Sequence, residues 1–187
     1  MRDRSVELDR HHKVLWRKWL WLCAIVIVTV VFQATDSFAR SHIFLINRSA
    51  SLPHWAFFIE RGALPSRGDI AFFKLPKTDL AVRHFGERPA PFGKIVYGMP
   101  GDVIERHGEN VSIRMEGDNG ASLVKVVGQT KSLTKTGEVL VRGPVGVIPQ
   151  DCYYMGSPHK DGFDSRYAAV GLVCARQVIG VARRVFL

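Results

Sequence analysis

The sequence has 187 residues, of which 47% are hydrophobic and 23% charged, and this fits one modest globular domain with an appendage rather than two full domains. The formal net charge is +9, but the basic residues are scattered, and no nucleic-acid-binding motif lies among them. We therefore expect no nucleic acid partner, because scattered cations suit a domain that lies over anionic lipid headgroups.

The first segment of the chain, residues 1–18, is basic, with six Lys or Arg against three Asp or Glu. An uncharged run of 17 residues follows at residues 19–35, and as a helix it would span about 26 Å. Tryptophans and cations flank this run, as is typical of a helix end at a membrane interface. The pattern predicts a transmembrane helix over residues 19–38, with residues 1–18 in the cytoplasm by the positive-inside rule and residues 39–187 on the other side.

Two other interpretations of the apolar run stay open at this point. A cleaved secretory signal has a shorter apolar core and a small-residue cleavage site, and the residues that follow the run, DSFAR (36–40), make a poor one. A buried helix of a soluble fold would not normally carry cations and tryptophans at its end.

The chain beyond residue 38 contains short apolar stretches that are rich in Val, Ile, Phe and Tyr and are separated by turn-forming residues. These stretches are DIAFFKL (69–75), NVSIRM (110–115), LVKVVG (123–128), EVLVRG (138–143), CYYMG (152–156) and QVIGVARRVFL (177–187). The pattern predicts a mainly β fold, a compact antiparallel β-barrel or sandwich over residues 39–187. The stretch 77–94 can hold a helical turn or a loop.

Two of the three cysteines, Cys152 and Cys174, lie in this domain, and Cys23 lies in the apolar run. In an oxidising compartment the pair can form a disulfide, and two partly buried free thiols are the alternative.

A serine becomes a nucleophile only when a base takes its proton. Histidine is the usual base, but no motif ties a histidine to a serine and an acid here; a Ser–His–Asp triad is recognised by geometry, so it stays open. Lysine can replace histidine if burial among apolar groups lowers its pKa. Lys94 lies in such a setting, PFGKIVYGMPGD, although a lysine there can also reach solvent.

Four sequence blocks follow the apolar run in a fixed order. They are SASLP (49–53), RGDIAFF (67–73), KIVYGMPGD (94–102) and YYMGSPHKDGFDSRY (153–167). A membrane anchor followed by these blocks resembles the type I signal peptidases, the membrane-bound serine-lysine peptidases of family S26.

The resemblance implies a catalytic Ser–Lys dyad in which Ser51 is the nucleophile and Lys94 is the general base. Ser49 matches the hydroxyl that forms the oxyanion hole together with the backbone N–H of Ser51. The alternative for Ser49 is a turn hydroxyl that bonds its own backbone.

The resemblance also assigns a supporting role to six residues: Pro53, Gly98, Gly101, Asp164, Ser165 and Arg166. Proline restricts the backbone after the nucleophile, and glycine permits the tight turn that aims the lysine. A carboxylate and a guanidinium two residues apart in a strand share one face, so each can find partners there.

Two positions depart from the usual block of general signal peptidases. Ser157 replaces its first acid, and Gly162 stands where a serine often contacts the catalytic lysine. The segment 103–153 is also short, so the large extra β domain of many signal peptidases is missing. These features look more like the pilin-maturation peptidases of conjugative plasmids, the TraF type.

We therefore predict a membrane-bound serine endopeptidase that cleaves membrane-proximal precursor peptides after small residues and matures, with or without ring closure, a conjugative prepilin. Its expected place is the bacterial inner membrane, with the catalytic domain in the periplasm and with the bilayer and a precursor protein as partners. No cofactor or metal is expected, because the sequence has no HExxH, no CxxC pair and no clustered histidine ligands at zinc spacing. The alternatives are a general type I signal peptidase of secreted proteins and a non-catalytic bitopic pilus or secretion assembly factor. A self-cleaving transcriptional regulator would need a DNA-reading helix-turn-helix, and the N-terminus offers an apolar helix instead.

Overall fold

The computed structural model describes residues 4–116 and 122–187. Residues 1–3 of the predicted cytoplasmic segment lie outside this description. The chain divides into two compact units, Met1–Ser41 and His42–Leu187.

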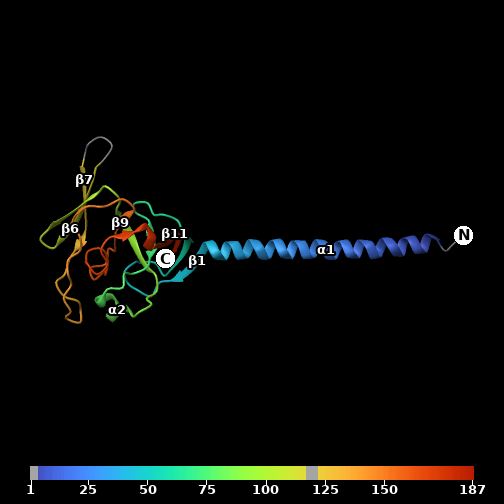
Figure 1. Ribbon diagram of the computed structural model, residues 1–187, viewed down its shortest axis with the longest axis horizontal. Coiled ribbons are helices and arrows are strands. Elements are labelled where there is room, and N and C mark those ends of the chain that lie inside the picture. Colours follow the sequence, from blue (N-terminus) through green and yellow to red (C-terminus); the bar gives the residue numbers. More distant parts are fainter. Residues whose placement is uncertain (1–3, 117–121) are drawn as a thin grey trace. The chain divides into compact units, whose positions relative to one another are not determined.

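The N-terminal unit contains one long helix, α1 (Arg4–Ser41), drawn in blue in Figure 1. Its part from Trp16 to Ser41 has a mean hydropathy of 1.9 and is long and apolar enough, by length and composition, to cross a membrane. The hydroxyls of Thr29 and Thr35 donate to carbonyl oxygens one turn earlier, at 2.9 and 2.8 Å. These polar groups are thus satisfied within the helix, as a hydrocarbon environment requires.

The second unit is built from two antiparallel sheets (Figure 1). The larger sheet has the order β1-β2-β11-β3-β4-β9-β10, and the smaller has the order β7-β6-β5-β8. The larger contains β1 (His42–Ile46), β2 (Ala56–Arg61), β3 (Ile70–Phe73), β4 (Phe92–Gly98), β9 (Cys152–Gly156), β10 (Val173–Cys174) and β11 (Val178–Phe186), with the 3-10 turn η1 (Ala175–Gln177) before β11. The smaller contains β5 (Val103–His107), β6 (Asn110–Glu116), β7 (Ser122–Gln129) and β8 (Gly146–Val147). The predicted mainly β, antiparallel fold is confirmed.

One short helix, α2 (Asp79–Phe85), lies within the stretch 77–94 that the sequence left open. The Thr78 hydroxyl accepts a hydrogen bond from the Ala81 N–H at its start, and Gly86, with a φ of 79°, follows its end. Because both caps are local, this helical turn is specified by the sequence around it.

The strand predicted at residues 138–143 is wrong. Among the described residues this region makes only two isolated bridges, Leu133 with Val139 and Arg142 with Tyr167. Its β-branched and apolar run, Val139 to Val141, fits a strand, but Val139 and Val141 face solvent and only isolated bridges form beside them.

The core cluster that positions the loop between β1 and β2 consists of Leu52, Phe57, Ile59 and Phe72. Leu52 belongs to that loop, and only 4% of it is exposed. Burial of a leucine side chain contributes roughly 1.5 to 3 kcal/mol. The loop is therefore anchored on the sheet by its own apolar residue.

A disulfide joins β9 to β10 through Cys152 and Cys174, which face each other in the strand register. It resolves the choice between a disulfide and two free thiols that the sequence left open. The bond spans 22 residues of sequence, and β9 also pairs with β4, so the crosslink braces the strand next to β4.

Loss of this disulfide is expected to lower the free energy of unfolding of the β domain by roughly 3 kcal/mol, the loop-closure entropy for a bond that spans 22 residues. The measurement is thermal unfolding of the full chain in detergent, for wild type and for a Cys152→Ser, Cys174→Ser double variant. Cys23→Ser, on α1, is the matched control and should melt like wild type. An unchanged midpoint in the double variant would contradict the stabilising role.

Candidate active site

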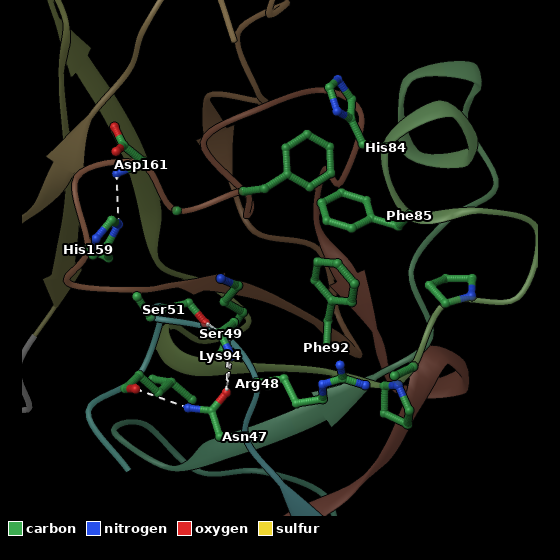
Figure 2. Close-up of a pocket in the computed structure, with 18 of the residues that line it drawn as sticks. Asn47, Arg48, Ser49, Ser51, His84, Phe85, Phe92, Lys94, His159 and Asp161 are labelled. Atoms are coloured by element: carbon green, nitrogen blue, oxygen red, sulfur yellow. Dashed lines mark hydrogen bonds between the residues drawn. The ribbon is translucent and has the colours of Figure 1, made fainter. Parts of the chain in front are cut away.

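A cavity of about 900 Å³ opens in the β domain. It is lined by the loop after β1, by the end of α2, by the start of β4 and by residues of two segments, 131–136 and 159–163 (Figure 2). Its aromatic lining residues are Phe57, Phe72, Phe85, Phe92, Phe163 and Tyr167. A long, largely apolar cavity with a few polar groups suits an extended peptide.

The candidate nucleophile Ser51 lies in the loop between β1 and β2, next to the buried Leu52. The loop is closed where the Asn47 N–H donates to the Trp55 carbonyl oxygen at 2.7 Å. The Asn47 side-chain amide donates to two more carbonyl oxygens of the loop, those of Leu52 at 3.1 Å and His54 at 2.7 Å. The loop that carries Ser51 is thus held by the hydrogen bonds of Asn47 between its two ends and by the burial of Leu52.

The two serines predicted to act together lie in direct contact. The Ser49 and Ser51 hydroxyl oxygens are 2.9 Å apart, and the Ser49 hydroxyl and N–H both donate to Asn47 Oδ1, at 3.1 and 3.0 Å. The Ser49 hydroxyl bonds to the side chains of Asn47 and Ser51. It does not bond to its own backbone, which was the other interpretation of this serine. Within the described chain, no histidine hydrogen-bonds to Ser51.

The candidate base Lys94 lies in β4, opposite Ala71 of β3, and is only 3% exposed. Burial lowers the pKa of its amine from 10.5 to about 8; the nearby Asp164 carboxylate raises this pKa, and the Arg166 guanidinium lowers it. Lys94 and Ser51 line the same cavity, and Figure 2 shows them at the same side of it together with Ser49. In the described residues no hydrogen bond joins Lys94 to Ser51.

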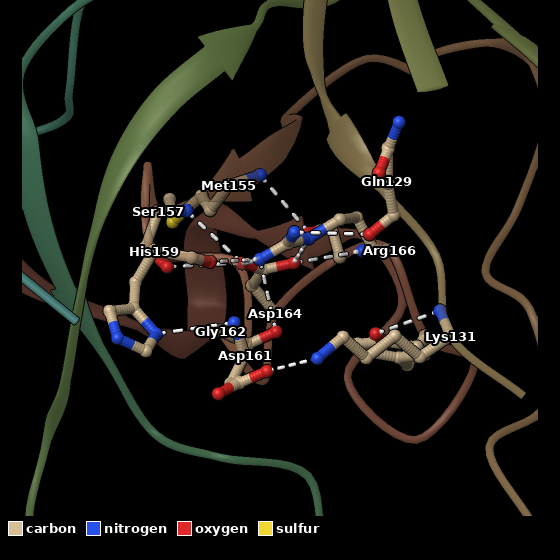
Figure 3. Close-up of polar contacts among 11 residues, drawn as sticks. Gln129, Lys131, Met155, Ser157, His159, Asp161, Gly162, Asp164 and Arg166 are labelled. Atoms are coloured by element: carbon tan, nitrogen blue, oxygen red, sulfur yellow. Dashed lines mark hydrogen bonds and ion pairs between the residues drawn. The ribbon is translucent and has the colours of Figure 1, made fainter. Parts of the chain in front are cut away.

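Behind Lys94 lies a buried ion pair between Asp164 and Arg166, whose side chains are 0% and 2% exposed. The guanidinium donates to both carboxylate oxygens, each at 2.8 Å (Figure 3). The sequence prediction placed these two residues on one face of a strand, each with its own partners. In the structure they lie in a loop and pair with each other. The geometry is bidentate, which is the strong form of this interaction.

The same block ties separate parts of the chain together. Arg166 also donates to the carbonyl oxygens of Gln129, His159 and Gly162 at 3.1 to 3.2 Å. The Ser165 hydroxyl accepts from the Met155 N–H of β9 at 3.0 Å. The DSR block therefore links β9 and β7 to the cavity wall.

Gly162, where a serine is often found in signal peptidases, lies in a position with little room for a side chain. A Cβ at this position would overlap the Ser157 hydroxyl and would lie 2.8 Å from Asp164 Oδ2. The β4–β9 ladder pairs Ile95 with Gly156, so its continuation by one residue sets Lys94 opposite Ser157. Ser157 thus occupies the space that a side chain at 162 would need.

The turn after β4 is held by contacts that the sequence did not reveal. Gly101 has a φ of 90°, in the region that favours glycine, and a Cβ on Gly98 would lie 2.9 Å from Tyr154. Asp102 accepts from the Met99 N–H at 2.7 Å and binds both terminal nitrogens of Arg67, at 2.7 and 3.0 Å. The RGD and PGD blocks are therefore joined by one ion pair.

Pro53 is exposed beside the buried Leu52.

Comparison with known families gives one match. The model for signal peptidase, peptidase S26, matches residues 16–187, which include the apolar part of α1 and every residue of the cavity. A search of curated proteins finds no match to the sequence.

Asp164→Asn is expected to lower the free energy of unfolding of the β domain by about 3 to 5 kcal/mol, because it leaves the Arg166 charge buried without its partner. Urea unfolding of the full chain in detergent measures the loss. Asp79→Asn removes an exposed carboxylate from the first turn of α2 and should change stability by less than about 0.5 kcal/mol. Equal stability of the two variants would show that the pair is not a structural brace.

Proposed function

Because the chain belongs to the signal peptidase family, peptidase S26, whose members are serine peptidases, we propose that Ser51 is its nucleophile and Lys94 its general base. The observation that carries this proposal is the buried Lys94 amine, with a pKa of about 8, in the wall of the cavity that also receives the Ser51 hydroxyl. An amine with this pKa is neutral in roughly a tenth of the molecules at pH 7 and in about half at pH 8, so a usable fraction can accept a proton.

Acylation follows from this arrangement. A peptide segment lies in the cavity, neutral Lys94 takes the proton from Ser51 Oγ, and Oγ attacks the carbonyl carbon of the scissile bond. The Ser49 hydroxyl and the Ser51 N–H donate to the oxyanion that forms. The Ser51 N–H has no partner among the described residues, so it is available for this role.

The tetrahedral intermediate then collapses to the acyl-enzyme as the same proton path runs in reverse. The Lys94 ammonium gives its proton to the leaving amine as the C–N bond breaks, which returns the base to its neutral form. A water molecule attacks the ester carbonyl with Lys94 again as base, and Ser51 leaves with the proton restored. Attack by an amine instead of water would join two peptide ends.

The membrane arrangement completes the proposal. The apolar helix α1 anchors the enzyme, with residues 1–18 in the cytoplasm and residues 39–187 on the periplasmic side of a bacterial inner membrane, as the basic flank favours. The substrate is then a precursor protein that is cut close to the membrane, after small residues.

Within the family we propose a pilin-maturation role of the TraF type, with a prepilin as substrate. Three features support it: Gly162, Ser157 in the adjoining space, and the small four-stranded sheet in the segment 103–153. A general signal peptidase would carry a serine at 162, and that side chain does not fit here unless Ser157 moves.

Ser51→Ala and Lys94→Met are each expected to reduce processing of a co-expressed precursor by at least about 10³-fold, because one removes the nucleophile and the other the base. Mass spectrometry of the product from cells that carry candidate prepilins measures it. A product lighter by one water than the trimmed linear chain would indicate ring closure.

Ser66→Ala and Lys77→Met, both exposed and outside the cavity, are matched controls that should process normally. Wild-type processing by both active-site variants would favour the non-catalytic assembly factor.

The pH dependence of cleavage provides an independent check. Because burial lowers the pKa of Lys94 to about 8, kcat/KM should rise about tenfold per pH unit below this value and level off above it. The measurement is initial rates of cleavage of a designed precursor by the full chain in detergent micelles, between pH 5 and pH 10. A rate that keeps rising towards the ordinary lysine value of 10.5 would mean that Lys94 is not desolvated in the working enzyme.

A further inference from the structure

The side chain of Asn47 uses all of its hydrogen-bonding groups within the loop that carries the two serines. Its Nδ2 donates to the carbonyl oxygens of Leu52 and His54, and its Oδ1 accepts from the N–H and the hydroxyl of Ser49. The orientation of the amide is fixed by these partners, because a flipped amide would point its oxygen at two carbonyls and its NH2 at an N–H.

The hydroxyl protons in this cluster can be assigned by counting. Asn47 Oδ1 has no proton to give, so the Ser49 hydroxyl must donate its single proton to it. Ser49 therefore has none left for Ser51, and in the 2.9 Å contact the Ser51 hydroxyl is the donor. The resting loop thus contains a directed chain of hydrogen bonds, from Ser51 to Ser49 to Asn47.

From this geometry we propose that Asn47 is a positioning residue that holds the Ser49 hydroxyl ready for the oxyanion; the inference rests on the proposed roles of Ser51 and Ser49. When a substrate carbonyl enters, rotation about one C–O bond moves the Ser49 proton from Asn47 Oδ1 to the developing oxyanion. Asn47 Oδ1 keeps the hydrogen bond from the Ser49 N–H, so the backbone of Ser49 stays in place during this rotation.

The Ser51 proton moves in a separate step. It rests on the Ser49 oxygen, which can still accept it after the Ser49 hydroxyl has turned to the oxyanion. The Ser51 hydroxyl must then turn its proton to the Lys94 amine before attack. Asn47 also lines the cavity, but its side-chain donors and acceptor are all used within the loop, so it acts through Ser49.

Asn47 can fill this role because it is attached to the sheet. It follows β1 directly, and its N–H bond to the Trp55 carbonyl oxygen extends the β1–β2 ladder, whose last pair is Ile46 with Ala56. Oxyanion donors accelerate a reaction only when they are fixed before the charge forms. The hydrogen bonds of Asn47 give Ser49, which is exposed, the fixed position that its own packing does not provide.

A double-mutant cycle tests the proposal, with cleavage of a designed precursor by the full chain in detergent micelles. Ser49→Ala should lower kcat by about 10² to 10³-fold. Asn47→Ala should lower kcat by about 10 to 10²-fold, with KM changed by less than about threefold, since misplacement of one group by about 1 Å has this effect. The key expectation is that Asn47→Ala adds less than about threefold to the loss in the Ser49→Ala background.

The proposal is overturned if Asn47→Ala reduces kcat by the same factor with and without Ser49, because Asn47 would then only maintain the loop. It is equally overturned if the single variant keeps wild-type kcat, or if its loss lies in KM. Asn110→Ala, which removes an exposed asparagine paired with Gln129 on the small sheet, is the matched control and should leave kcat unchanged.

Folding and function are checked in parallel. If Asn47→Ala does not melt cooperatively, Asn47→Ser repeats the cycle, because its hydroxyl can still accept from the Ser49 N–H; the same coupling with a smaller loss is expected, and additive losses overturn the proposal. Ser51→Ala is assayed alongside. If Ser51→Ala is inactive and the coupling is absent, only the inference about Asn47 fails, whereas an active Ser51→Ala removes the proposed catalytic function as well.

Discussion

The burial of one lysine amine is the constraint on which the rest of the site depends. A lysine in water is charged at neutral pH and cannot accept a proton. The pKa of Lys94 is lowered to about 8 because the sheet removes the amine from water, with its backbone paired to β3 and its side chain 3% exposed. The surrounding charges must not cancel this effect. Asp164 alone would attract the ammonium, but it is already paired with Arg166, which opposes that attraction.

This constraint has a cost in stability that depends on pH. The pKa of Lys94 is 10.5 in an unfolded chain and about 8 in the folded one. Between these values the unfolded state binds more protons, so the free energy of unfolding rises with pH across this window, and below about pH 8 the penalty for burying the ammonium is complete. The apolar burial of the Leu52 cluster, which borders the cavity, offsets part of that penalty.

The sequence predicted the parts of this arrangement that depend on local pattern. The apolar run, the antiparallel character of the domain and the apolar setting of Lys94 can be read over a few consecutive residues, and the order of blocks identified the family. Contacts between distant residues carry no such signal. Arg67 meets Asp102 across 35 positions, and Ser157 fills the space at Gly162 only because β9 and the loop after it fold together. The strand expected at 138–143 is wrong for the same reason: composition describes one segment, but a strand also needs a continuous ladder with its neighbours, and this segment makes only isolated bridges.

The two proposed catalytic residues, Ser51 and Lys94, are held in place by different contacts. Ser51 is fixed by the loop closure at Asn47 and by Leu52 beneath it, whereas Lys94 is fixed by the sheet register. The two supports meet on β3, where Phe72 packs against Leu52 and Ala71 pairs with Lys94. The Ser51 hydroxyl is satisfied by Ser49. A substrate carbonyl that takes the Ser49 proton would break the link from Ser49 to Asn47 Oδ1, whereas the Ser49 oxygen can still accept from Ser51.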